Sequence, residues 1–122
     1  EQSEKMAAVA VTISADFKAN LAQLPDVDKI EAIELTFMDT GEPCDIIENK
    51  PGKSGSVKVY NYLLLQFPGG EITRQAAYLG VAIYAEHIED SHPNPGKHPN
   101  IDRLFNVINS GRTLVATVKA AQ

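Results

Sequence analysis

The sequence predicts an α+β domain in which three to four helices cover one face of a small, mainly antiparallel sheet. Three observations carry this prediction. Residues 31–49 have the pattern of a β-hairpin, residues 113–118 that of a further strand, and the segments between them repeat apolar residues at helical spacing. With 122 residues and 43% hydrophobic content, the chain suits one domain with its own core.

The hairpin is the clearest element. In "EAIELTFM", residues 31–38, Ile33, Leu35 and Phe37 alternate with other side chains, which predicts a half-buried strand. Turn-forming residues follow in "DTGEP", and "CDIIEN" predicts a second strand. We expect "TLVATV", residues 113–118, to pair with this hairpin and complete the sheet.

The chain divides into an N-terminal arm or tail, residues 1–13, and the domain proper, residues 14–119. Within the arm, "MAAVAVTI", residues 6–13, carries a weak strand pattern, because alanine is a poor strand former. Ser14 is placed to cap a short helix that carries Phe17, Leu21 and Leu24 on one face and stops at Pro25.

Three further helices are expected. Residues 56–67, "SVKVYNYLLLQF", place apolar side chains around most of a helical wheel; a strand is the alternative, because Val-Lys-Val-Tyr also alternates. Residues 71–91 are predicted as the longest helix. The segment "PNIDRLFNVINSG" predicts another, with Pro99 in its first turn and Gly111 at its end.

The overall composition restricts the function. A formal net charge of −5 and a pI of about 5.1 disfavour a nucleic-acid binder. No segment has the roughly 20 apolar residues that span a bilayer. The single cysteine, Cys44, cannot form an internal disulfide, so we expect the cytoplasm or another reducing compartment, an organelle interior included, and a buried, inert thiol. No cofactor fingerprint is present, and we expect no cofactor.

Two Pro-Gly-Lys loops, "NKPGKSGS" and "NPGKHPN", each lead into a predicted helix. Free N–H groups at a helix start attract anions, glycine permits close approach, and lysine adds charge. The candidate anion-binding residues are Gly52, Lys53, Ser54, Ser56, Gly96, Lys97 and His98. A nucleotide-binding P-loop is disfavoured, because Ile47 stands where its first glycine is required.

The alternative for both loops is ordinary helix capping. Ser54 or Ser56 would then cap the first helix, and His98 or Asn100 the second. If the fold brings both loops together, two helix dipoles and two lysines converge, which favours a ligand.

Histidines and acids gather in residues 86–102. A metal site would use His87, Asp90, His92 and His98, since His87 and Asp90 share a helix face at i, i+3. No recognised zinc signature is present, and a partly buried, hydrogen-bonded His87 is the favoured interpretation. An enzyme would use one of these histidines with Glu86 or Asp90. The acids lie near a helix C-terminus and need a cationic neighbour, such as a metal, Lys97 or Arg103.

The run from "FKANLAQLP" through "IENKPGKSGSVKVY" to "AEHIEDSHPNPGKHPNIDRLF" resembles a family of small bacterial proteins, a domain of unknown function. The resemblance covers about residues 16–118, and the two Pro-Gly-Lys loops are its most distinctive part. It implies a compact single domain and assigns no functional residue.

The leading functional hypothesis is a soluble, non-catalytic accessory or adaptor domain that binds another protein, with residues 6–13 as one contact. The first alternative is a module that binds a phosphorylated or carboxylated small molecule at the two loops. The second is a metal- or histidine-dependent enzyme using residues 86–102.

Overall fold

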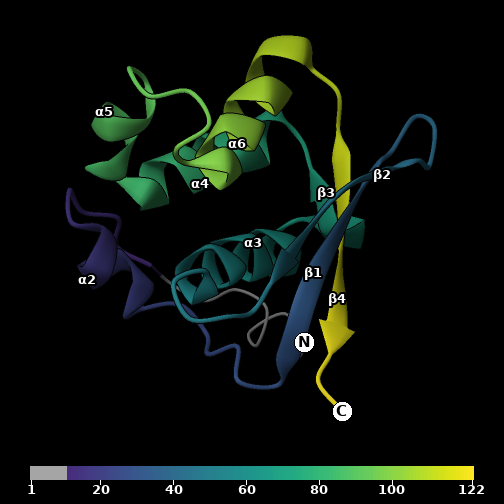
Figure 1. The fold of residues 1–122 in the computed structure, drawn as a ribbon, viewed down its shortest axis with the longest axis horizontal. Coiled ribbons are helices and arrows are strands. Elements are labelled where there is room, and N and C mark those ends of the chain that lie inside the picture. Colours follow the sequence, from purple (N-terminus) through teal and green to yellow (C-terminus); the bar gives the residue numbers. More distant parts are fainter. Residues whose placement is uncertain (1–10) are drawn as a thin grey trace.

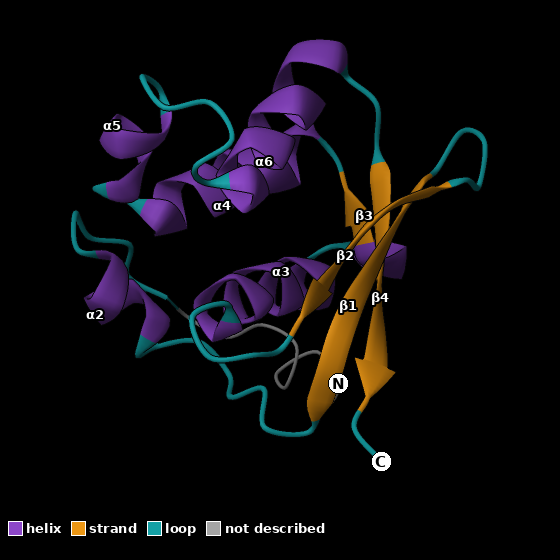
Figure 2. Ribbon diagram, in the orientation of Figure 1, coloured by secondary structure: helices purple, strands orange, loops and turns teal. Residues whose placement is uncertain are grey.

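The computed structural model describes residues 11–122, and it confirms the α+β architecture. A four-stranded antiparallel sheet forms one layer, and the helices gather on one side of it (Figure 1). Figure 2 shows the same division by secondary structure. Within these residues there are five α-helices, of which α3, α4 and α6 are substantial.

The sheet has the strand order β2-β1-β4-β3. Strand β1, Ile30–Phe37, pairs with β2, Pro43–Glu48, in the predicted hairpin and with β4, Leu114–Ala120, on its other side. Ile33 and Leu35 are buried and Glu34 is exposed, so the predicted alternation is confirmed. The edge strand β3, Glu71–Ile72, has only two residues.

Helix α3, Ser54–Gln66, confirms the prediction of a helix rather than a strand. Residues 59–63 are buried without interruption, because the sheet and other helices cover most sides of α3. Helix α4, Arg74–Tyr84, packs against α6, Pro99–Ser110, at Gly80. A Cβ atom at Gly80 would lie 2.8 Å from Leu104 Cδ1, so the two helices approach closely there.

The predicted helix over residues 71–91 is wrong at both ends. Ile72 belongs to β3, and Thr73 begins α4 by accepting a 3.2 Å hydrogen bond from the Ala76 amide. The chain then turns at Ala85, where φ is 52° and ψ is −117°, and a short separate helix, α5, spans His87–Ser91. A helix cannot continue through a residue with positive φ.

Near the N-terminus, helix α2 spans Phe17–Leu21 and Leu24 is buried beyond it. Ser14 is not the cap: Asp16 occupies that position, and the Ser14 hydroxyl bonds Asn20 Oδ1 at 3.1 Å instead. Residues 6–10 of the predicted arm lie outside the described residues, and residues 11–13 contain no strand.

None of the helices within residues 11–122 combines the length and apolarity needed to cross a bilayer.

Candidate functional site

The two Pro-Gly-Lys loops, far apart in the sequence, line one cavity of about 390 Å³. Its lining residues come from the starts of α3 and α6, from α2 and α5, and from the end of α4, which are labelled in Figure 1. Five of the seven candidate residues line it, whereas Ser54 and Gly96 do not. The lining residues are Phe17, Gly52, Lys53, Gly55, Ser56, Tyr84, His87, Lys97, His98, Pro99, Asn100 and Ile101.

The first loop ends at Lys53, the N-cap residue of α3, and Gly52 turns with φ of 86°. Neither serine caps this helix, so the capping interpretation of the first loop is wrong. The Ser56 hydroxyl instead accepts a 2.7 Å hydrogen bond from the Tyr84 hydroxyl. Because the Tyr84 proton occupies that bond, the proton of Ser56 is left to donate elsewhere.

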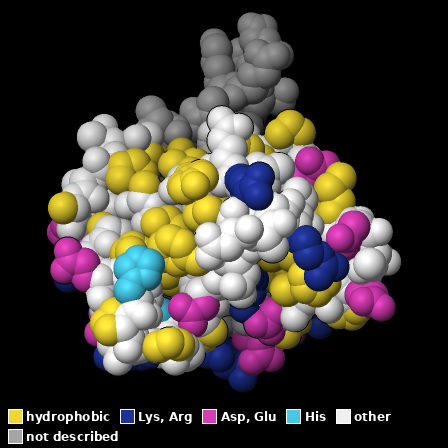
Figure 3. Space-filling model, turned by 90° about the horizontal axis from the view of Figure 1, so that it is seen from above, with side chains coloured by type: hydrophobic (Ala, Val, Ile, Leu, Met, Phe, Trp, Pro, Cys, Tyr) yellow, Lys and Arg dark blue, Asp and Glu magenta, His cyan; other side chains and the backbone are white. Residues whose placement is uncertain are grey.

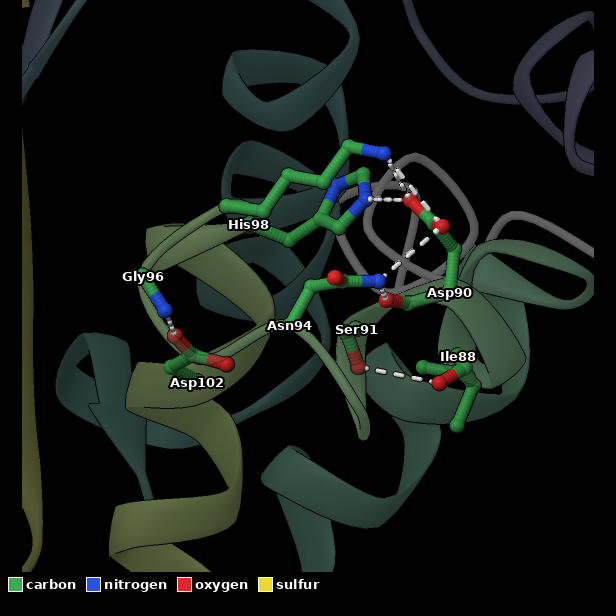
Figure 4. A network of polar contacts seen from close by, with 8 residues as sticks. Ile88, Asp90, Ser91, Asn94, Gly96, His98 and Asp102 are labelled. Carbon is green, nitrogen blue, oxygen red and sulfur yellow. Dashed lines mark hydrogen bonds and ion pairs between the residues drawn. The ribbon is translucent and has the colours of Figure 1, made fainter.

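Asp90 holds the second loop in place (Figure 4). Its carboxylate lies 2.6 Å from His98 Nε2 and 3.0 Å from Lys97 Nζ. His98 is the N-cap residue of α6 but makes no capping bond with its side chain, and Asn100 takes no cap position. The hydrogen bond from His98, and then that from Lys97, hold the pKa of Asp90 below its ordinary value. Lys97 therefore supplies the cationic compensation expected for this acid, and His98 adds a hydrogen bond.

Aromatic rings form another wall of the cavity. Phe17 and Tyr84 stack with centroids 5.2 Å apart and an angle of 14° between their planes. The His87 ring meets Phe17 edge-on at 4.8 Å and lies 5.8 Å from the His98 ring. Burial raises the pKa of Tyr84 above its ordinary value, so its hydroxyl stays protonated as the donor to Ser56.

The two lysines of the cavity differ in their pairing. Lys53 is exposed and has no ion-pair partner within 4.0 Å among residues 11–122, whereas Asp90 balances Lys97. The starts of two helices of 13 and 12 residues add their positive ends.

The metal ligands proposed from the sequence do not assemble. His98 and Asp90 meet, but His92 turns away and lies against Phe105, with ring centroids 4.9 Å apart. Within the described part of the chain, no three histidine, cysteine, aspartate or glutamate side chains are placed to hold a metal ion. Glu86 accepts a 2.8 Å hydrogen bond from the Phe17 amide and thereby attaches α2 to α5.

Behind the cavity, a buried arginine fixes the first turn of α6. Arg103 Nη1 donates to Asn100 Oδ1 at 2.8 Å and to the Tyr60 hydroxyl at 3.2 Å, and Nη2 bonds Asp45 of β2. Tyr60 in turn donates to the Asn100 carbonyl at 2.6 Å. Burial raises the pKa of Tyr60 to about 12, which keeps that donor protonated.

Sequence patterns did not predict these supporting residues. Tyr60 and Tyr84 match the expectation of core packing, but Arg103 was proposed only as a partner of the acids in α5. A buried arginine gives no periodic signal, because its partners Asp45 and Tyr60 lie 58 and 43 residues away in the chain.

A second cavity, of about 490 Å³, lies between α6 and the hairpin. Arg103, Arg112 and Cys44 are among its lining residues. Cys44 is half-buried rather than fully buried, and burial raises the pKa of its thiol. Arg112 is paired with Asp39 at 3.0 Å and lies 4.0 Å from the centre of the Phe37 ring.

Fold and site together define a small α+β domain with a cavity where two glycine-lysine loops meet. The family model described as "Uncharacterized protein conserved in bacteria (DUF2322)" matches residues 17–118, and the chain belongs to this family. The resemblance noted from the sequence is thereby confirmed. No curated protein and no solved structure matches the chain significantly.

Proposed function

We propose that this domain binds a small anionic molecule in the cavity between the two Pro-Gly-Lys loops. The observation that carries the proposal is that both loops, separated by more than 40 residues of sequence, line the same cavity. The sequence alone favoured a protein-binding adaptor, mainly because no other signature was present. Because two lysine-bearing loops share a cavity, we favour the anion-binding hypothesis over the protein-binding one.

Each group on the loops has a role in this proposal. Lys53, free of any ion pair within the described chain, supplies a full positive charge. Ser56 supplies a hydroxyl proton, and the uncapped start of α3 supplies backbone N–H groups. Lys97 and His98, held by Asp90, form the opposite side at a fixed position.

Thermal unfolding with added phosphate or acetate tests the proposal. A ligand that binds only the folded state at about one hundred times its Kd stabilises that state by roughly 2.7 kcal/mol. We expect Lys53→Ala to abolish the rise in the melting midpoint. Lys50→Ala is the matched control, because Lys50 lies in the same loop but pairs with Glu48 at 2.9 Å. Equal rises in both variants would exclude a site at Lys53.

A protein-binding role is a second proposal, supported by exposed hydrophobic side chains. Tyr78 of α4 is 60% exposed, and Ile46, on the edge strand β2, is 45% exposed. Seen from above, hydrophobic side chains gather over the helices (Figure 3). Size measurement in lysate and after purification tests this role; a monomer in both, with nothing co-purifying, would contradict it.

A catalytic role is a third proposal, supported by the imidazole–carboxylate pair of His98 and Asp90 at the cavity. A carboxylate orients a histidine in many acid–base sites. Hydrolysis of p-nitrophenyl phosphate that His98→Ala abolishes would support it. Equal rates for wild type and variant would remove His98 from any such reaction.

A further inference from the structure

The cavity is larger than an inorganic anion needs. Its volume of about 390 Å³ is more than ten times the roughly 30 Å³ that one water molecule occupies in the liquid. It falls within the range of roughly 300–1,000 Å³ that is typical of pockets for organic ligands. A bare phosphate at Lys53 would leave most of this space to water.

Rings and apolar groups bound much of the remaining space, beside Lys97, His98 and Asn100. Phe17 and Tyr84 are stacked, the His87 ring abuts Phe17, and Pro99 and Ile101 also line the cavity. Flat aromatic walls favour planar groups, because offset-stacked and edge-to-face contacts between rings add to the stabilisation from burial. A flexible alkyl chain would gain only the burial.

Hydrogen bonds attach this wall to neighbouring elements. Tyr84 is 4% exposed and its hydroxyl is fixed on Ser56 at 2.7 Å, which couples the aromatic wall to the loop of Lys53. Phe17 is fixed through its backbone amide, which donates to Glu86. A ligand that fits between the lysines and this wall meets a preformed surface, so less conformational entropy is lost on binding.

From this juxtaposition we propose that the ligand is a planar-ring compound carrying one phosphate or carboxylate, with the anion at Lys53 and Ser56 and the ring against the half-buried rings of Phe17 and His87, which Tyr84 supports from behind. This inference rests on the proposed anion-binding function and specifies the class of ligand.

The probes are inorganic phosphate, phenyl phosphate, butyl phosphate and benzoate, measured by isothermal titration calorimetry on the whole chain. We expect phenyl phosphate to bind about tenfold more tightly than inorganic phosphate, and more tightly than butyl phosphate. Comparing the affinities for phenyl phosphate and benzoate shows whether the site prefers a phosphate or a carboxylate as the anionic group of the ligand.

Two variants separate the two parts of the site. Phe17→Leu keeps an apolar side chain and is expected to lower affinity for phenyl phosphate about fivefold while leaving inorganic phosphate unchanged. Phe105→Leu is the matched control, since Phe105 packs on His92 outside the cavity. Lys53→Met is expected to weaken every probe.

The outcomes distinguish the two proposals. The planar-ring inference is overturned if phenyl phosphate binds no better than inorganic phosphate, or if Phe17→Leu changes the affinity for neither compound. The anion-binding proposal still holds in that case, provided that Lys53→Met loses binding. If no probe binds the wild-type chain, both proposals fail. Circular dichroism melts of each variant confirm that the chain is folded in every titration.

Discussion

Replacing Arg103 with methionine tests whether the buried arginine holds the first turn of α6, and with it one wall of the cavity. The side chain is only 9% exposed and bonds Asp45, Asn100 and Tyr60. Methionine keeps much of the apolar stem but removes the charge and every donor.

The expected loss follows from the state of each partner. Each lost bond comes from the charged guanidinium, and a hydrogen bond of this kind contributes roughly 1.5–3 kcal/mol. Part of this is regained, because the side chain of Asp45 is 50% exposed and can be hydrated. Tyr60 keeps its bond to the Asn100 carbonyl, so no buried hydroxyl is left unsatisfied. We therefore expect the free energy of unfolding to fall by about 2–3 kcal/mol.

Urea denaturation measures this change. With an m-value of about 2 kcal/mol/M, the midpoint should fall by about 1–1.5 M urea. Arg112→Met is the matched control: Arg112 also pairs with an aspartate, but the pair is exposed, and exposed pairs contribute little. The reasoning is refuted if both variants lose the same stability, or if Arg103→Met shifts the midpoint by less than about 0.3 M. A loosened α6 start should also weaken phosphate binding.

Three further changes test local features. The lowered pKa of Asp90 means that its interactions stabilise the fold above its ordinary pKa of 3.8 and lose this effect as the pH falls through the lowered value. The difference in melting midpoint between wild type and Asp90→Asn should therefore shrink in acid. A difference that stays constant with pH would contradict this. Gly70→Ala should lower the free energy of unfolding, measured in urea, by about 3 kcal/mol, because φ is 69° and the new Cβ would lie 2.4 Å from the Ala116 carbonyl oxygen. An unchanged free energy of unfolding would contradict this and show that β4 shifts to accommodate the Cβ. Ala85→Gly should stabilise the chain by about 1 kcal/mol, because it relieves the positive φ between α4 and α5; a lower melting midpoint would refute strain there.

The sheet and the main helices could be predicted because local patterns determine them. Alternation in β1 and the helical stripe of α6, with Pro99 at its start and Gly111 at its end, reflect burial on one face and backbone preferences of single residues. The failures occurred where local pattern conflicts with packing. Residues 71–91 keep a helical stripe, yet Ile72 pairs with Leu114 of β4 and the chain turns at Ala85.

The candidate site could be predicted only in part. Glycine, lysine and histidine at the starts of two helices are visible in the sequence, because helix starts and turns have local signatures. The aromatic wall is not visible, since Phe17, Tyr84 and His87 come from three different helices.

The sequence by itself determined an acidic α+β domain with a hairpin, a closing C-terminal strand and two lysine-bearing loops before helices. Only the tertiary structure decided that these loops share a cavity, that Asp90 binds Lys97 and His98, and that Arg103 supports α6. The physical reason is range: backbone preference and burial act on neighbours in the chain, whereas a cavity depends on how separate elements pack, which single-residue patterns do not encode.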